Sequence, residues 1–370
     1  MHQRESIKVL ISGGGTGGHV FPAIAIADAL KKQVQKPQIL FVGAKGKMEM
    51  EKVPKAGYHI LGLNIAGLQR RITYKNLIVV FKLLDSMIRA RNIIKRFKPD
   101  VVIGVGGYAS GPVLYAAAKR HIPTIIQEQN SYPGLTNRLL AKKVSKICVA
   151  YDGMDKYFPK SKIYLTGNPV RKDILNLDDK RSEALKYFGI SGKKKTLLVL
   201  GGSQGARTIN QSVKANLKLF IDNDIQVIWQ TGKLYFKEAN EYAKELNRKE
   251  ILVVSFIEKM DLAYSACDMV VSRSGAISVS EISVVQKPAV FIPSPNVAED
   301  HQTKNAQALA NHNAAIIVKD SEAREKLGEV VVETILDKDK KQRLKEKIAG
   351  FAIKDSADRI ASVVLNSLNK

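Results

Sequence analysis

Cysteine is scarce in this sequence: only Cys148 and Cys267 occur in a chain of 370 residues. Both lie inside apolar stretches, and neither has the spacing of a metal site or of a CxxC redox motif. This scarcity argues against a disulfide-stapled scaffold and against a cysteine-ligated metal domain. We expect two buried structural thiols in a protein of a reducing compartment.

Long hydrophobic runs are lacking as well. The stretch 101–118 carries no charge, but it contains four glycines and one proline. That composition is typical of a strand, a loop and a helix start rather than of a membrane span. The first residues, MHQRESIKVLISGGG, have only a very short apolar run before glycine, unlike a secretory signal. We expect a cytoplasmic protein whose membrane contact is peripheral.

Acidic residues are outnumbered: 35 Asp and Glu stand against 59 Lys and Arg, which gives a net charge of +24. This surplus indicates an anionic partner, such as nucleic acid, an acidic membrane face or a phosphorylated substrate. Aromatic residues make up only 6% of the chain. No helix-turn-helix, zinc or RNP pattern occurs, so we expect no nucleic-acid partner. Ordinary solvated helix faces would give the same surplus, and that alternative stays open.

Short β-branched segments alternate with longer amphipathic segments along the chain. We predict a helix over Pro22–Lys32 and strands over Ile7–Ser12, Gln38–Gly43, Asp100–Gly106, Pro123–Gln127 and Lys146–Ala150. The pattern then restarts, with strands predicted from Lys195 and over Ile225–Gly232, Ile251–Ile257, Asp268–Ala276 and Pro288–Pro293. Repeated βαβ units predict an α/β fold of two doubly wound, Rossmann-like parallel-sheet domains.

We place the domains at residues 1–167 and 168–355, with a hinge near Gly167–Asp173, where GNP interrupts regular structure. Residues 356–370 are expected to form a last helix that packs back on the first domain. Open parallel sheets bind ligands at the carboxyl ends of their strands. Two such sheets facing one another would form a cleft lined by the glycine-rich loops 13–18 and 201–206.

The first glycine-rich loop, in ISGGGTGGHVFPA, matches the spacing G-x-G-x-x-G through Gly13, Gly15 and Gly18. Such loops bring backbone amides at a helix N-terminus close to phosphate. The second strand, however, ends at Gly43, where a dinucleotide site places an acid, which argues against NAD. No Walker lysine follows either loop, which argues against a P-loop ATPase. We expect no cofactor.

The second half offers polar groups suited to a nucleotide sugar. Glu281, about two turns into the helix begun by SRSGAISVSE, can accept hydrogen bonds from both ribose hydroxyls; the alternative is a surface helix residue. Ser203 in GGSQGA can donate to a phosphate oxygen or simply cap a turn. HQTKNA, residues 301–306, carries donors and acceptors for sugar hydroxyls, or ordinary polar residues of a helix start.

Together these motifs resemble the MurG family of bacterial transferases. That family moves N-acetylglucosamine from UDP-GlcNAc onto lipid I, undecaprenyl-pyrophosphoryl-MurNAc-pentapeptide. The matching segments, in family order, are GGGTGGHVFPAIAIA, GVGGYASGPVLYAA, EQNSYPGLTNRLLA, TGNPVR, GGSQGARTIN, SRSGAISVSE and HQTKNA. The resemblance implies the GT-B architecture, an acceptor and membrane-associated first domain, and a UDP-GlcNAc-binding second domain.

The resemblance also implies roles for individual residues. Thr16, Gly17 and Gly18 would approach the donor sugar or the acceptor pyrophosphate, and Asn130, Arg171 and Ser203 match donor-site or phosphate positions. The backbone of Ile257 would meet uracil, Ala276, Ile277, Ser278, Val279, Ser280 and Glu281 would wrap phosphate and ribose, and Gln302 and Asn305 would read the GlcNAc hydroxyls. This chain has Gln127 and His301 where relatives often carry histidine and glutamine.

By the same resemblance the reaction is inverting: the C4 hydroxyl of MurNAc attacks the anomeric carbon and UDP leaves. Helix N-termini, Ser203 and either Arg171 or Arg273 would stabilise the charge on UDP. His19 is our candidate for the base and Glu128 the second candidate. The D-x-D at residues 222–224 is interpreted as a turn, and no metal is expected.

A lipid acceptor requires contact with the anionic inner membrane surface, on its cytoplasmic face. Residues 67–97 offer an apolar helix whose early part, Ile72–Phe81, would be exposed; the alternative is a core helix on the sheet. Its basic frame comprises Arg70, Arg71, Lys75, Lys82, Arg89 and Arg91, with Lys142 and Lys143 nearby in the patch. Two other functions remain open: a related glycolipid-forming glycosyltransferase with a diacylglycerol acceptor, and a non-catalytic UDP-sugar-binding module.

Overall fold

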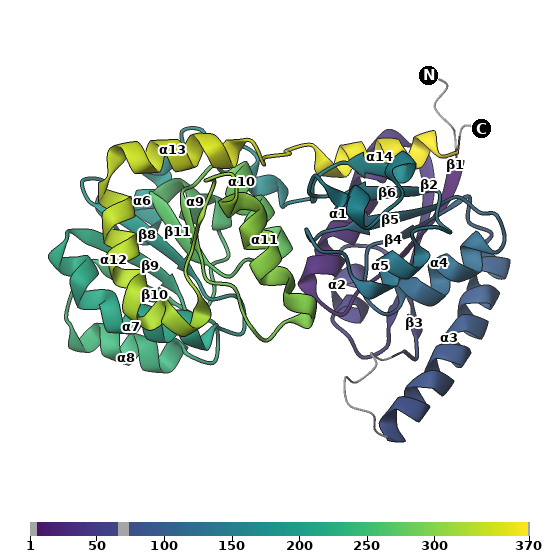
Figure 1. The fold of residues 1–370 in the computed structure, drawn as a ribbon, viewed down its shortest axis with the longest axis horizontal. Coiled ribbons are helices and arrows are strands. Elements are labelled where there is room, and N and C mark those ends of the chain that lie inside the picture. Colours follow the sequence, from purple (N-terminus) through teal and green to yellow (C-terminus); the bar gives the residue numbers. More distant parts are fainter. Residues whose placement is uncertain (1–5, 66–73, 369–370) are drawn as a thin grey trace. The chain divides into compact units, whose positions relative to one another are not determined.

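A computed structural model describes residues 6–65 and 74–368 of the chain, which form two α/β units (Figure 1). The boundary between the units falls between Val170 and Arg171, and the chain returns to the first unit at Asp355. Within the described ranges, no helix is long and apolar enough to traverse a bilayer.

The first unit is built on a parallel sheet with the strand order β3-β2-β1-β4-β5-β6-β7. Its strands are β1 (Ser6–Ser12), β2 (Lys36–Ala44), β3 (His59–Leu63), β4 (Val101–Gly104), β5 (Thr124–Glu128), β6 (Lys146–Val149) and β7 (Ile163–Leu165). Its helices are α1 (Gly17–Gln33), α2 (Glu49–Lys55), α3 (Tyr74–Phe97), α4 (Ser110–Ala118), α5 (Leu135–Leu140) and α14 (Ser356–Asn366).

Helices cover both faces of this sheet. Successive side chains of a strand point to opposite faces, so neighbouring residues of one strand enter different core clusters. Along β1, Val9 and Ile11 pack in one core cluster with α1 and α14, while Leu10 packs in another with α3 and α4. A strand covered on both sides has no polar face, so it reads as a continuous apolar run. Cys148, on β6, lies in the first of these clusters.

The second unit repeats this plan with the strand order β10-β9-β8-β11-β12-β13, again parallel. Its strands are β8 (Lys195–Leu200), β9 (Ile225–Gln230), β10 (Ile251–Val254), β11 (Met269–Ser272), β12 (Ala289–Phe291) and β13 (Ile316–Ile317). Its helices are α6 (Arg181–Phe188), α7 (Arg207–Asp222), α8 (Phe236–Glu245), α9 (Met260–Ala266), α10 (Ala276–Val284), α11 (His301–Ala310), α12 (Ala323–Leu336) and α13 (Lys338–Ala349). The prediction of two Rossmann-like parallel sheets is confirmed.

Each sheet reverses its strand order at one point, between β1 and β4 in the first unit and between β8 and β11 in the second. The loops at the carboxyl ends of these strands diverge there, which opens the crevice where doubly wound sheets bind ligands. In the first unit the two loops are 13–16 and 105–109, and in the second they are 201–206 and 273–275. The glycine-rich motifs of the sequence therefore fall at both reversal points.

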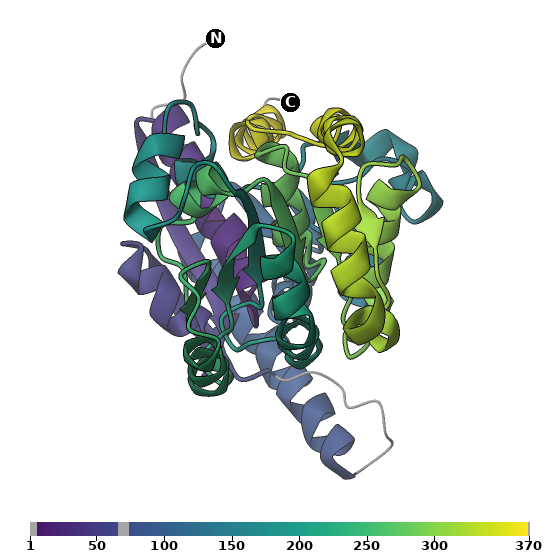
Figure 2. The same cartoon turned by 90° about the vertical axis from the view of Figure 1, so that its left-hand side faces the viewer.

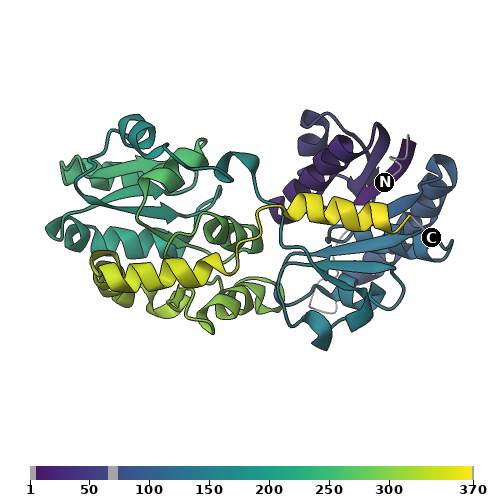
Figure 3. The same cartoon turned by 90° about the horizontal axis from the view of Figure 1, so that it is seen from above.

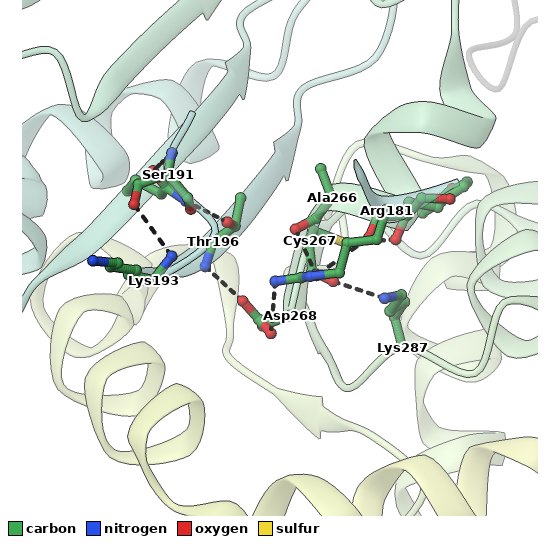
Figure 4. A network of polar contacts seen from close by, with 11 residues as sticks. Arg181, Ser191, Lys193, Thr196, Ala266, Cys267, Asp268 and Lys287 are labelled. Atoms are coloured by element: carbon green, nitrogen blue, oxygen red, sulfur yellow. Dashed lines mark hydrogen bonds and ion pairs between the residues drawn. The ribbon is translucent and has the colours of Figure 1, made fainter. Parts of the chain in front are cut away.

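At the amino-terminal ends of these central strands, an aspartate in each unit hydrogen-bonds one strand to its neighbour. Asp100 accepts from the Lys8 N–H at 2.7 Å and returns its own N–H to the Lys8 carbonyl at 2.8 Å. Asp268 makes the same exchange with Thr196, with both distances 2.8 Å (Figure 4). Arg181 flanks Asp268 at 3.7 Å. The repeated clamp fixes the register of the first and fourth strands in each sheet.

The structure corrects two details of the predicted elements and confirms the expected state of the cysteines. Strands β3, β7 and β13 were not predicted, and each lies at the edge of a sheet, where exposure breaks the apolar run. Helix α1 begins at Gly17 rather than at Pro22, because the Thr16 carbonyl already accepts from the N–H groups of His19 and Val20. The expected buried thiols are confirmed: Cys148 and Cys267 are both 0% exposed.

The last helix, α14, belongs to the first unit and packs against α1 (Figure 3). Ile360 and Val364 of α14 are fully buried in the same core cluster as Ile26 of α1. The first unit therefore consists of two segments of the chain that are separated by the whole second unit.

Candidate active site

His19 is the third residue of α1, directly after the first glycine-rich loop. Its Nδ1 lies 3.0 Å from the Gly14 carbonyl oxygen and 3.3 Å from Thr16 Oγ1. A carbonyl oxygen only accepts, so Nδ1 is the donor toward Gly14 and carries the proton of the neutral ring. The lone pair of the neutral ring is then on Nε2, which is the form that a general base requires.

The N-terminus of α1 carries the other residues expected in this loop. Thr16 precedes the helix with an extended backbone, and its side chain makes no capping hydrogen bond. Gly17 and Gly18 form the first two helical positions and are only half-buried. Amides of the first helical turn, left uncovered by side chains, attract anions. The loop therefore presents a basic imidazole and a helix N-terminus at one end of the sheet.

Sequence reasoning missed Glu49, the first residue of α2, whose carboxylate lies under this loop. Glu49 is only 1% exposed, and its Oε2 accepts from the Gly15 N–H at 2.9 Å. Its Oε1 accepts from the Ala44 N–H, also at 2.9 Å. An acid therefore does reach the end of the second strand, but it comes from the following helix and binds the loop instead of a ribose.

Glu128, the second candidate for the base, ends β5 and is buried. Its Oε1 accepts from the N–H and the side-chain amide of Asn130, and its Oε2 accepts from the Gly134 N–H and from Asn137 Nδ2 at 2.8 Å. Burial raises the pKa of the Glu128 carboxyl, and these hydrogen bonds act in the opposite direction. The geometry is that of a group that shapes the loop 130–134, and it holds Asn130 in place.

Gln127 is also fully buried. Its Nε2 donates to Asn168 Oδ1 at 2.9 Å, and its Oε1 accepts from Gln129 Nε2. Asn168 Nδ2 in turn donates to the Gln129 carbonyl at 2.9 Å. This closed set of amides ties the segment that leads toward the second unit to the end of β5, and it gives Gln127 a structural position.

In the second unit, Ser203 lies exposed in the loop between β8 and α7. Its carbonyl accepts from the Lys233 N–H at 3.3 Å. The loop is held tightly where Gly205 meets Gly232, because a Cβ at Gly232 would lie 2.1 Å from Gly205 N. The side chain of Ser203 thus stands on a backbone fixed by two close-packed glycines.

Helix α10 begins at Ala276 after Gly275, and no side chain caps its N-terminus. Ala276, Ile277 and Ser278 are half-buried, while Val279 is buried in the core. The first turn therefore offers amide N–H groups and the positive end of the helix dipole at the reversal point of the sheet. Ser280 turns its hydroxyl back onto the Ala276 carbonyl at 3.0 Å.

Glu281 lies one turn further along α10 and is only 7% exposed, so its interpretation as a surface residue is wrong. Its Oε1 accepts from Arg171 Nε at 2.9 Å. The Tyr264 hydroxyl lies 3.4 Å from its Oε2. Burial raises the pKa of the Glu281 carboxyl, and the Arg171 guanidinium acts in the opposite direction. Two of the expected donor-site residues, Arg171 and Glu281, are thus brought into direct contact.

Ile257 is buried, and its backbone N–H donates to Gln230 Oε1 at 3.0 Å. Gln230 ends β9 and is itself buried. In this structure the side-chain amide of Gln230 therefore holds the backbone group that was expected to meet uracil. Gln230 was not singled out from the sequence, because nothing near it in the chain marks its partner.

The expected sugar-reading residues lie on α11, next to the loop that precedes α10. Gln302 Oε1 accepts from the Ser294 N–H at 2.9 Å, and the Gln302 carbonyl accepts from Ser274 Oγ at 2.8 Å. Asn305 is fully buried, and its Nδ2 donates to the Ser274 carbonyl at 3.2 Å. His301 Nδ1 lies 2.7 Å from the Ala298 carbonyl. Gln302 and Asn305 thus brace the Ser274 loop from one side.

Arg273, one of two candidates for stabilising UDP, is engaged elsewhere. It donates to the carbonyls of Ile292 and Pro293 and pairs with Asp320. Arg171, the other candidate, instead contacts Glu281 in the interior of α10.

The D-x-D at 222–224 is a turn, as predicted. Asp222 ends α7, and Asp224 pairs with Lys194 at 2.9 Å just before β9 begins. Within the part of the chain that the structure describes, no three His, Cys, Asp or Glu side chains gather in a way that could hold a metal ion.

Comparison with protein families covers both units. The profile of the glycosyltransferase family 28 N-terminal domain matches residues 9–149, and that of the glycosyltransferase family 28 C-terminal domain matches residues 196–360. The crystal structure of Acinetobacter baumannii MurG aligns with a TM-score of 0.80 at 28% identity, covering 97% of this chain and 99% of that one. The expected fold class is thereby confirmed a second time.

Two relatives are similar over nearly their whole length. A protein of Flavobacterium psychrophilum is 52% identical over 364 residues, which cover 97% of this chain and 98% of the relative. A protein of Bacteroides fragilis is 53% identical over 365 residues, which cover 98% of this chain and 96% of the relative. Both bear the name UDP-N-acetylglucosamine--N-acetylmuramyl-(pentapeptide) pyrophosphoryl-undecaprenol N-acetylglucosamine transferase.

Proposed function

This chain belongs to glycosyltransferase family 28, and on that premise we propose that it transfers N-acetylglucosamine from UDP-GlcNAc to lipid I. The product is the disaccharide-bearing lipid II of peptidoglycan synthesis. One observation carries the assignment: identity of about half extends across both units, as it would in a chain that keeps both a donor-binding and an acceptor-binding half.

We assign the donor nucleotide to the second unit. The open first turn of α10 offers amides for the diphosphate, with exposed Ser203 as a second donor of hydrogen bonds. Glu281 lies further along α10, where Arg171 and Tyr264 contact its carboxylate. When one of these two side chains moves away, the carboxylate can accept hydrogen bonds from the ribose hydroxyls. Arg171 then lies beside the leaving UDP, where a cation stabilises the developing negative charge.

Uracil recognition follows from the backbone of Ile257. Its N–H donates to the side-chain amide oxygen of Gln230. A carbonyl oxygen of a pyrimidine base is an acceptor of the same kind. We propose that uracil replaces this contact when the nucleotide binds. The sugar would be met from α11 by Gln302, which is half-buried, with fully buried Asn305 fixing the Ser274 loop behind it.

We assign the base to His19 rather than to Glu128. The Nδ1–H of His19 is committed to the Gly14 carbonyl, which leaves the lone pair of the neutral ring on Nε2. Both oxygens of buried Glu128 already accept hydrogen bonds from the loop that contains Asn130. A proton taken up by either oxygen of Glu128 would place a hydrogen on an atom that already accepts from two donors.

The proposed reaction is a single displacement. The C4 oxygen of MurNAc forms a bond to the anomeric carbon of GlcNAc, and the bond from that carbon to the phosphate oxygen breaks. The electron pair of the broken bond leaves with UDP, and the hydroxyl proton goes to His19 Nε2. Attack from the face opposite UDP inverts the anomeric configuration. The amides at the start of α1, with Thr16 beside them, are suited to the acceptor pyrophosphate.

We propose that the first unit meets the membrane through an apolar surface on α3 and α5. Phe81, Leu84 and Ile88 lie on one face of α3 and are exposed, Phe81 to 64%. Leu135 and Leu139 are similarly exposed one turn apart on α5, Leu139 to 68%. Helix α3 extends beyond the rest of its unit (Figures 1 and 2), as a segment that reaches a surface would.

Basic side chains gather at Tyr115 of α4, the helix that packs against both α3 and α5. Lys119 and Lys143 both lie over the Tyr115 ring, at 5.1 Å and 4.6 Å from its centre. The hydrogen bond from Lys119 lowers the pKa of Tyr115, and Lys143 and Arg91 add to the effect. Each such cation contributes roughly 1 kcal/mol near anionic lipid. Of the segment expected to bind membrane, residues 66–73, with Arg70, Arg71 and Ile72, lie outside the described residues, as does the Lys75 side chain.

The transferase proposal is tested by following UDP release from UDP-GlcNAc with and without purified lipid I. We expect release to depend on lipid I and mass spectrometry to show one added N-acetylhexosamine on the lipid. Binding of UDP-GlcNAc without release would instead indicate a sugar-binding module. Transfer to diacylglycerol but not to lipid I would indicate a glycolipid-forming enzyme.

A further inference from the structure

Glu49 is a buried acid with no place in the reaction described above. It is 1% exposed, and a carboxylate removed from water must receive hydrogen bonds to remain compatible with folding. Its two oxygens are shared between two parts of the chain. Oε1 takes the N–H of Ala44 at the end of β2, and Oε2 takes the N–H of Gly15 in the glycine-rich loop.

The glycines around Glu49 show how closely it is fitted. A Cβ at Gly14 would lie 2.2 Å from the Glu49 carboxyl carbon, and a Cβ at Gly43 would lie 2.5 Å from its Cγ. Gly14 also has a φ of +148°, which other residues rarely adopt. Gly14 of the glycine-rich loop and Gly43 of β2 therefore make room for this side chain, and the loop and the acid pack tightly together.

The peptide group between Gly14 and Gly15 is held on both of its polar sides. Its N–H donates to Glu49 Oε2 at 2.9 Å, and its carbonyl accepts from His19 Nδ1 at 3.0 Å. A peptide group is planar, so fixing its N–H fixes the direction of its carbonyl. Glu49 is thereby connected to the imidazole of His19 through a single rigid group.

The opposite edge of the imidazole is confined by the neighbouring loop. A Cβ at Gly106 would lie 2.8 Å from both Cδ2 and Nε2 of His19. The Gly106 carbonyl accepts from the Gly14 N–H at 3.3 Å, so this loop also holds the Gly14 backbone. The ring is therefore confined from two sides, and the contact with the Gly14 carbonyl places a proton on Nδ1.

We propose that Glu49 is a positioning residue for His19: through the Gly14–Gly15 peptide it keeps the proton on Nδ1 and the lone pair on Nε2. The inference deepens the proposed function and rests on it for the role of His19 as the base. It parallels the way a buried carboxylate sets the tautomer of a catalytic histidine, with a peptide group interposed between the two. Hydrogen bonds in such a chain strengthen one another.

The test uses Glu49→Gln, which keeps the shape of the side chain but replaces one acceptor with an amide N–H. That N–H must face the N–H of Gly15 or of Ala44, so one of the two contacts is lost. Glu51→Gln is the matched control. Glu51 lies two positions further along α2, is exposed and pairs only with surface lysines in the described structure.

The first measurement is the tautomer of His19, read from nitrogen chemical shifts of protein labelled with ¹⁵N-histidine, at a pH where the ring is neutral. His19→Asn identifies the resonances. We expect protonated Nδ1 in the wild type and in Glu51→Gln, and a mixture of tautomers in Glu49→Gln. A wild-type ring with its proton on Nε2 overturns the proposal even if the Glu49 variant does not fold.

The second measurement is steady-state transfer to lipid I. We expect Glu49→Gln to lower kcat at least about tenfold while the KM for UDP-GlcNAc changes less than about twofold, because the donor lies in the other unit. An unchanged kcat together with an unchanged tautomer refutes the inference. An altered tautomer in a protein whose His19→Ala variant turns over normally leaves Glu49 as the positioning residue and instead removes His19 from the mechanism.

Discussion

Arg171 Nε donates to Glu281 Oε1 at 2.9 Å, which joins the first residue of the second unit to the interior of α10. Glu281 is almost fully buried and Arg171 is partly exposed, with 9% and 41% of their side chains accessible. The carboxylate of the pair is thus shielded from water, whereas the guanidinium is partly solvated. Two predictions about the donor site follow from this asymmetry.

Replacing Glu281 by glutamine should weaken UDP-GlcNAc recognition. A hydrogen bond to a charged group is worth about 1.5–3 kcal/mol, so kcat/KM for UDP-GlcNAc should fall about tenfold or more. Steady-state kinetics with saturating lipid I measure the effect. Glu325→Gln, on the exposed side of α12, is the control and should behave as the wild type. An unaltered KM for UDP-GlcNAc in Glu281→Gln would rule out the ribose contact.

Replacing Arg171 by alanine should make donor binding depend on pH. Burial raises the pKa of Glu281 and Arg171 counteracts it, so removing the guanidinium raises this pKa further. The carboxyl is then protonated up to a higher pH and accepts less well. The KM for UDP-GlcNAc should rise as pH falls and recover as pH rises. Lys172→Ala removes the same charge from the neighbouring exposed position and should give a flat profile.

Replacing His19 by alanine should lower turnover at least about a hundredfold, the usual effect of losing a general base. The measurement is kcat for transfer to lipid I, with binding of UDP-GlcNAc followed separately by calorimetry. Binding should persist, because the residues that we propose for the donor belong to the second unit. His59→Ala on exposed β3 serves as the control. Near-normal turnover of His19→Ala would show that another group accepts the proton.

Replacing Asp268 by asparagine should destabilise the second unit. Asp268 Oδ2 accepts the Thr196 N–H at 2.8 Å, and Arg181 lies 3.7 Å from Oδ1. The amide N–H of asparagine must face one of these two donors, and a buried donor left without its acceptor costs about 1–3 kcal/mol. Asp224→Asn is the comparison, because Asp224 is exposed and its φ of +60° suits asparagine. Chemical denaturation should separate the two variants clearly. Equal stabilities would mean that the clamp contributes nothing.

Membrane binding should combine apolar and electrostatic contributions. Phe81→Ser with Leu84→Ser should reduce the fraction bound to anionic vesicles, because about 25 cal/mol is lost for each Å² of apolar surface kept from burial. Raising salt should release the wild type, since surface charges are screened over about 8 Å at physiological ionic strength. Sedimentation with phosphatidylglycerol vesicles measures both effects. Binding that ignores salt, or no binding at all, would contradict the proposed surface.

The sequence predicted the central strands well, and the reason is physical. A parallel strand covered on both faces must be apolar throughout, so β1, β4, β8 and β11 can be recognised without tertiary information. The edge strands β3, β7 and β13 have exposed positions and lack that signature. The start of α1 was misplaced because Pro22 favours a first helical position, whereas here it lies inside the helix.

The candidate site residues likewise fall into those with a local sequence signal and those without one. Residues in glycine-rich turns, such as His19 and Ser203, could be placed because the turn itself indicates the end of a strand. Glu49 and Gln230 could not, because each acts on a segment far away in the sequence and has ordinary neighbours in its own. The burial of Glu281 could not be predicted either, because its neighbours in the sequence do not indicate that Arg171 packs against it.

The return of α14 to the first unit also affects how the protein is made. A ribosome that has completed the first seven strands has not yet supplied the helix whose Ile360 and Val364 fill the core beside α1. The half synthesised first therefore stays unfinished until the half synthesised second has emerged. A nascent chain stalled before residue 356 would present the uncovered flank of α1 to chaperones and proteases.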